Sequence, residues 1–144
     1  MNPAVNFEKI TNVLKGDKNI VFALVFGSQA NGQANRLSDV DIGIFTKEDT
    51  PLLRMGRIVS ALEKVLKKEV DLVILNDIYK RKPNFAFQVI SSAKLLFTRD
   101  EDLFVEFKKN VFLYYLDAKP LIDMVKAAMN KRIEAGAFGE RNYA

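Results

Sequence analysis

The sequence lacks two residue types on which much enzyme chemistry depends. It contains no cysteine and no histidine among its 144 residues. The absence of cysteine excludes disulfide bonds, a thiol nucleophile and thiolate-bound zinc or iron–sulfur sites. The absence of histidine excludes triads with an imidazole base and every histidine-ligated metal. Any metal bound by this chain must therefore be held by oxygen ligands, which favours a hard cation such as Mg²⁺.

Long hydrophobic runs and a strong charge of one sign are also missing. The longest apolar run, Ile20 to Phe26, has seven residues, whereas a membrane-spanning helix needs about 20. The N-terminus shows no hydrophobic signal region. The net charge is +4, from 22 Lys and Arg against 18 Asp and Glu, an excess that surface lysines explain without an anionic partner. We therefore expect a cytoplasmic protein with no membrane partner and no nucleic-acid partner.

The composition that remains is that of a globular domain, with 49% hydrophobic and 28% charged residues. We predict one domain over residues 1–144, with a core at about 5–98 and C-terminal helices at about 100–135. Predicted strands cover residues 20–26, 39–45, 70–75 and 94–98. Predicted helices cover residues 5–15, 51–67, 84–90 and the region from about 100. This order predicts an α/β (α+β) fold in which helices flank a small mixed sheet.

Three features of the second half of the chain have ordinary structural interpretations. Pro120 is expected to interrupt or restart the last helix. The basic segment 79–82 is typical of a solvated turn. The segment 111–116 is apolar around the whole helix circumference, which predicts a buried helix whose far face contacts a partner or a second copy of the chain.

Asp39 and Asp41 are the first candidates for chemistry. On a strand, the period of two places both carboxylates on one face, with Cα atoms about 6.6 Å apart. Two carboxylates side by side repel each other, and their burial without a partner is costly. The pair therefore either faces water or binds a divalent cation.

Gly27 and Ser28 follow directly after the predicted buried strand 20–26. Gly27 permits a tight turn and the close approach of a ligand, and Ser28 could cap a short helix whose free N–H groups favour an anion. A plain strand–turn–helix connection is the alternative. The segment is not a P-loop, because Gln33 and Ala34 stand where Lys and Ser or Thr are required.

The pattern of Gly27-Ser28, ten intervening residues and Asp39-Val40-Asp41 resembles the signature of the nucleotidyltransferase superfamily that includes DNA polymerase beta and kanamycin nucleotidyltransferase. The resemblance covers roughly residues 20–97. The small size resembles the minimal nucleotidyltransferases, many of which are antitoxins paired with HEPN-type ribonuclease toxins. The family places a third carboxylate on a following strand, for which Asp71 is the best candidate and Glu69 the alternative.

The resemblance implies a set of site residues. Asp39, Asp41 and Asp71 would be the catalytic residues and the ligands of two Mg²⁺ ions, with Asp71 also available as general base. The nucleotide would be bound by Gly27, Ser28, Arg36 and Ser38. Family members often carry arginines in the loop between the serine and the first aspartate, but here only Arg36 is basic.

The resemblance also implies a reaction and a partner. A nucleoside monophosphate, AMP from ATP, would be transferred to an acceptor hydroxyl, which in the antitoxin branch is a tyrosine of a HEPN-type toxin. One alternative is a binding module of the same fold that neutralises a toxin by contact, and another is an enzyme acting on a small molecule. A homodimer formed through the C-terminal helices is a further expectation.

Overall fold

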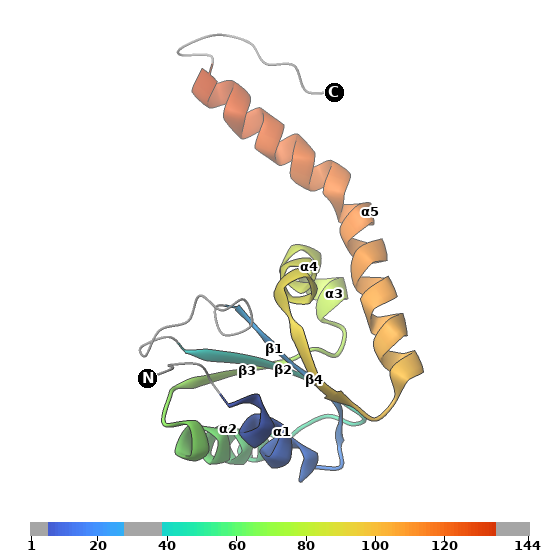
Figure 1. Cartoon of the computed structure of the whole chain (residues 1–144). Helices are drawn as coiled ribbons and strands as arrows, with labels where there is room; N and C mark the ends of the chain where they lie inside the picture. Colours follow the sequence, from blue (N-terminus) through green and yellow to red (C-terminus); the bar gives the residue numbers. More distant parts are fainter. Residues whose placement is uncertain (1–5, 28–38, 135–144) are drawn as a thin grey trace.

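The computed structural model describes residues 6–27 and 39–134 (Figure 1). Within these ranges the chain forms five helices and four strands. In chain order they are α1 (Phe7–Lys15), β1 (Ile20–Phe26), β2 (Val40–Thr46), α2 (Leu52–Leu66), β3 (Val70–Ile74), α3 (Ile78–Arg81), α4 (Pro83–Ser92), β4 (Lys94–Thr98) and α5 (Glu101–Glu134).

The four strands form one mixed sheet in the order β3-β2-β1-β4. β1 is antiparallel to both β2 and β4, whereas β2 and β3 are parallel. The parallel pair needs a crossover connection, which α2 supplies. The predicted fold class, a small mixed sheet flanked by helices, is confirmed.

β1 lies at the centre of the sheet and all seven of its residues are buried. Its continuous apolar sequence therefore serves two cores, because alternate side chains point to opposite faces. Ala23 and Val25 pack on the face covered by α1 and α2. Phe22, Leu24 and Phe26 pack on the face covered by α3, α4 and the first half of α5, and Figure 1 shows the two helical layers on either side of the sheet.

The core under α1 and α2 consists of closely packed apolar side chains. Leu62 of α2 is fully buried there, with Ile10 and Leu14 of α1. The N-terminal turn of α2 lies outside this core, since Leu52 is 84% exposed. Asn6 caps α1 by accepting hydrogen bonds from the N–H groups of Glu8 and Lys9.

Two features of the second half of the chain bear on the expectations from sequence. The basic segment 79–82 overlaps α3, a single helical turn whose first residue, Ile78, is buried, while Lys80, Arg81 and Lys82 are exposed as expected of a solvated segment. Pro120 was expected to interrupt or restart the last helix; it lies inside the continuous helix α5. The helix changes direction near its middle (Figure 1), as helices do where proline removes a backbone donor.

α5 is only partly covered by the rest of the molecule. Phe107 and Val111 are buried against the layer of α3 and α4, whereas Phe112, Leu113 and Leu116 are exposed to solvent. The segment that is apolar all round thus has one face in the core and another free in this single chain. No helix in the described part of the chain is long and apolar enough to cross a membrane.

Candidate active site

Gly27 forms the turn at the end of β1 in a conformation that other residues rarely adopt. Its φ angle is +74°, in the left-handed region. A Cβ atom added to Gly27 would lie 2.5 Å from Oδ2 of Asp41. Glycine is therefore required at this position for two reasons: it permits the turn, and it leaves room for the Asp41 carboxylate.

Asp41 occupies the same end of the sheet because of strand register. It pairs with Phe26 of β1 on one side and with Asp71 of β3 on the other. Val40, Ile42 and Ile44 are buried in the core under α1 and α2, so alternation directs Asp41 to the opposite face, toward α4.

The carboxylates of Asp39, Asp41 and Asp71 form a cluster in which they repel one another. Burial raises the pKa of Asp41 above its ordinary value, and the negative charges of Asp71 and then Asp39 raise it further. Asp39 and Asp71 are themselves exposed. Glu69, the alternative third carboxylate, is exposed and just precedes β3, where its carbonyl accepts a hydrogen bond from the N–H of Val40 (2.9 Å). The register thus places Asp71 beside Asp41.

The chemistry of this cluster fits a divalent cation. Its donors are all carboxylate oxygens, the ligands that Mg²⁺ prefers, and their mutual repulsion is what a cation would relieve. Across residues 6–27 and 39–134, no three acidic side chains are close enough together to form a preassembled metal site. The assignment of Asp39, Asp41 and Asp71 as metal ligands therefore stays a prediction.

A cavity of about 310 Å³ opens beside the carboxylates. The strands and the turn contribute Phe26, Gly27, Asp41, Asp71 and Val73 to its lining. The helix α4 contributes Phe85, Gln88, Val89 and Ser92. The cavity therefore has a carboxylate side on the sheet and a mixed aromatic and amide side on α4.

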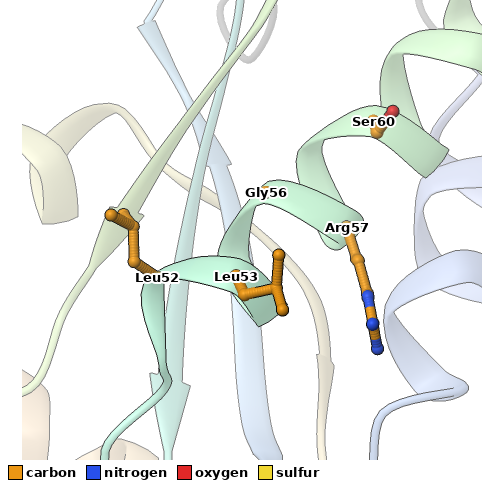
Figure 2. Close-up of a pocket in the computed structure, with 5 residues that line it drawn as sticks. All are labelled: Leu52, Leu53, Gly56, Arg57 and Ser60. Carbon is orange, nitrogen blue, oxygen red and sulfur yellow. The ribbon is translucent and has the colours of Figure 1, made fainter.

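A second depression lies on the other side of the molecule. It has a volume of about 640 Å³ and is lined by residues of α2 alone, shown in Figure 2 as Leu52, Leu53, Gly56, Arg57 and Ser60. Its lining carries no carboxylate, and α2 covers the face of the sheet opposite to α4. Size alone is therefore a poor guide to the site here.

Three of the predicted site residues, Ser28, Arg36 and Ser38, lie outside the described residues. Sequence reasoning also missed the contribution of α4. The signal available was weak: Gln88 and Ser92 are polar positions at helical spacing from Phe85.

Comparison with protein families shows to which family the chain belongs. A family model described as Polymerase beta, Nucleotidyltransferase matches residues 8–102. The chain belongs to this nucleotidyltransferase family. The matched segment begins in α1 and ends at the start of α5, so it contains the whole sheet and the Gly27, Asp41 and Asp71 cluster.

One curated protein is similar in sequence to part of this nucleotidyltransferase. A protein of Methanocaldococcus jannaschii that bears the name of a protein adenylyltransferase is 40% identical over 57 residues. The match covers 40% of this chain and 61% of that protein, so the chain spans less than two thirds of the curated relative.

Solved structures share the fold. A chain of a toxin–antitoxin complex with AMP-PNP has a TM-score of 0.71 at 22% identity, covering 87% of this chain and 99% of that chain. A chain from the complex of tri-AMPylated HEPN toxin and MNT antitoxin of Shewanella oneidensis gives 0.64 at 19% identity, covering 85% and 95%. A spectinomycin adenyltransferase from Enterococcus faecialis gives 0.51 at 12% identity, covering 96% and 79%. At these identities the likeness establishes the fold.

Proposed function

We propose that this nucleotidyltransferase is a Mg²⁺-dependent protein adenylyltransferase that transfers AMP from ATP to a tyrosine hydroxyl of a HEPN-type toxin and thereby acts as its antitoxin. The observation that carries the proposal is the in-register pair of Asp41 and Asp71 next to the Gly27 turn. Such a cluster of carboxylates is suited to holding metal-bound phosphates, and the family membership gives it the matching reaction class.

In the proposed reaction, Asp71 accepts the proton of the acceptor hydroxyl, and the oxygen attacks the α-phosphorus of ATP. The bond between the α-phosphorus and the bridging oxygen breaks, and pyrophosphate leaves. Asp39, Asp41 and Asp71 would hold two Mg²⁺ ions, which when bound would neutralise the phosphate charges. Gly27, Ser28, Arg36 and Ser38 would orient the triphosphate. Positioning and charge neutralisation suffice for this chemistry, so the lack of histidine and cysteine is no obstacle.

The toxin partner is supported by the fold comparison and by α5. Two solved structures that superpose over nearly their whole length come from toxin–antitoxin complexes. Phe112, Leu113 and Leu116 leave an apolar surface on α5 in the single chain, and such surfaces are typical of interaction sites. A second copy of the chain is the alternative occupant, and light scattering of the isolated protein would reveal that homodimer.

A small-molecule acceptor is the second candidate. It is favoured by the structural likeness to the spectinomycin adenyltransferase, which covers 96% of this chain. It is the weaker candidate because that enzyme is covered over only 79% of its own length. The toxin–antitoxin chain is covered over 99%.

The experiment that tests the proposal is a transfer assay with ATP, Mg²⁺ and a HEPN-type toxin encoded beside this chain. We expect label from the α-phosphate to appear on the toxin. The double substitution Asp39→Asn/Asp41→Asn should lower the rate more than about 100-fold, since even the loss of a residue that only hydrogen-bonds a metal ligand costs about 10- to 100-fold.

The matched control is Glu48→Gln/Asp49→Asn, which removes two exposed carboxylates just beyond the other end of β2. It should retain the wild-type rate. Neutralisation of the toxin without any transfer would contradict the enzymatic proposal and favour a binding module. Transfer to spectinomycin but not to the toxin would favour the small-molecule alternative.

A further inference from the structure

The cavity between the paired aspartates and α4 has negatively charged groups only on its sheet side. Its described lining contains the carboxylates Asp41 and Asp71 but no lysine or arginine. Phosphate groups are stabilised by cations and by backbone N–H groups, and carboxylates without a cation repel them. An uncharged group is therefore the better occupant of the part of the cavity that α4 encloses.

The walls of this cavity are suited to a flat ring. Phe85 of α4 contacts Phe26 of β1 with ring centroids 6.2 Å apart and an interplanar angle of 79°. Val73 and Val89 complete the apolar lining. Phenylalanine rings and branched aliphatic side chains favour aromatic ligands, which gain from edge-to-face contacts as well as from burial.

Gln88 provides a polar group on the α4 side. It follows Phe85 by three residues, so both lie on the helix face that lines the cavity. Within the described part of the chain, the Gln88 side chain has no hydrogen-bond partner. The Ser92 hydroxyl, by contrast, already donates to the Gln88 carbonyl oxygen (3.1 Å). The Gln88 amide is exposed to solvent and can therefore hydrogen-bond a ligand that enters the cavity.

We infer that this cavity is the acceptor pocket and that it takes the phenol side chain of a tyrosine, with Phe85 and Gln88 as specificity-determining residues. The inference rests on the proposed adenylyl transfer. The ring packs between Phe85 and Val73, and the Gln88 side-chain N–H donates a hydrogen bond to the phenol oxygen. The phenol hydroxyl faces the sheet, where Asp71 takes its proton. The resulting oxygen forms the new bond to the α-phosphorus as the bond to pyrophosphate breaks, giving AMP-tyrosine and pyrophosphate.

The adenine ring of ATP is the competing aromatic occupant, and steady-state kinetics separates the two. With the toxin as acceptor, Gln88→Ala and Phe85→Leu should each raise the KM for the toxin by roughly three- to tenfold, as expected for one lost hydrogen bond or a poorer ring contact. The KM for ATP should stay within about twofold. Asn84→Ala, which removes an exposed amide of α4 that does not line the cavity, should change neither constant.

A binding measurement without catalysis makes the inference independent of activity. The ¹⁵N-labelled full chain is titrated with N-acetyl-L-tyrosinamide, N-acetyl-L-phenylalaninamide and adenosine, in the absence of metal. We expect the tyrosine probe to shift the amide signals of residues 85–92 at lower concentration than the other two, and Gln88→Ala to weaken this effect.

Each outcome decides between the two occupants. Shifts at α4 caused by adenosine in preference to the tyrosine probe, or a raised KM for ATP in the Gln88→Ala variant, would assign the cavity to the nucleobase and overturn the inference. Absence of any binding of the tyrosine probe at α4 would also overturn it. Binding of the probe at α4 together with no AMP transfer to the toxin would support the pocket and refute the proposed function.

Discussion

The two faces of the sheet use the same strands for different purposes. Under α1 and α2, alternate residues of β1 and β2 form a closed core in which Ile42, Ile44 and Leu62 are fully buried. On the α4 side, the end of β1 and the start of β2 place Phe26, Gly27 and Asp41 at the border of a cavity. Both faces therefore carry an apolar core, but only the α4 face opens onto a cavity beside the carboxylates of Asp41 and Asp71. Substitutions on the two faces should therefore have different effects on stability and on activity.

The largest effect on stability is expected on the closed face. Leu62→Ala should lower the free energy of unfolding by about 2–5 kcal/mol, because it leaves a cavity among fully buried side chains. Denaturant unfolding measures this loss, while the KM for the acceptor, measured where the variant is folded, should not change.

The contrasting variant is Val89→Ala, which shortens a buried side chain that lines the cavity on the α4 side. It should cost less stability than Leu62→Ala and raise the KM for the acceptor. If Leu62→Ala changed the acceptor KM as much as Val89→Ala, the two faces would not be functionally separate.

An intermediate effect on stability is expected at Gly27, which forms the turn at the end of β1. Gly27→Ala should lower the free energy of unfolding by about 1–3 kcal/mol, since alanine is strained at a positive φ angle. Its Cβ would also displace the Asp41 carboxylate, so the transfer rate should fall at least about tenfold.

Gly56→Ala is the matched control for this glycine. A Cβ at Gly56 would meet no atom within 4 Å, and alanine is favoured inside a helix, so stability should rise by up to about 1 kcal/mol with unchanged activity. Equal behaviour of the two glycine variants in thermal unfolding and transfer assays would refute the special role of Gly27.

The smallest effect on stability is expected from the charge of Asp41. Because burial and neighbouring carboxylates raise the pKa of Asp41 in the folded state, its ionisation opposes folding at neutral pH. Without metal at pH 7, Asp41→Asn should therefore raise the melting temperature by roughly 1–3 °C while abolishing transfer.

The pH dependence of this gain has a definite sign. In the wild-type protein, Asp41 is protonated in the folded and the unfolded state below its unfolded pKa near 3.8. The free energy of unfolding falls as pH rises from there through the higher pKa of the folded state. The difference between variant and wild type should hence vanish toward pH 3.5 and be largest at neutral pH. A gain that is the same at both pH values would show that charge repulsion is not its cause.

Much of the fold is encoded locally in the sequence. The apolar run of β1 and the alternation from Val40 onward predict the two central strands, because side-chain period and burial leave few other arrangements. The same alternation separates Asp41 from the core residues Val40 and Ile42. Gly27 after a buried strand predicts a turn, which the positive φ angle confirms.

The remaining features depend on contacts between distant segments. The fit of Gly27 to Asp41 follows from the pairing of Phe26 with Asp41, which no local pattern specifies. The position of α4 beside the carboxylates depends on β4, which adds to the edge of β1. The continuation of α5 through Pro120 likewise goes against local propensity.

The central claim is that the carboxylate cluster on the α4 side supports transfer of AMP. The most direct test incubates the chain with Mg²⁺, a HEPN-type toxin and ATP labelled at either the α- or the γ-phosphate. The account predicts that the α label becomes attached to a toxin tyrosine, and that the γ label is released as pyrophosphate in equal amount. Attachment of the γ label, or neutralisation of the toxin with neither label attached, would contradict it.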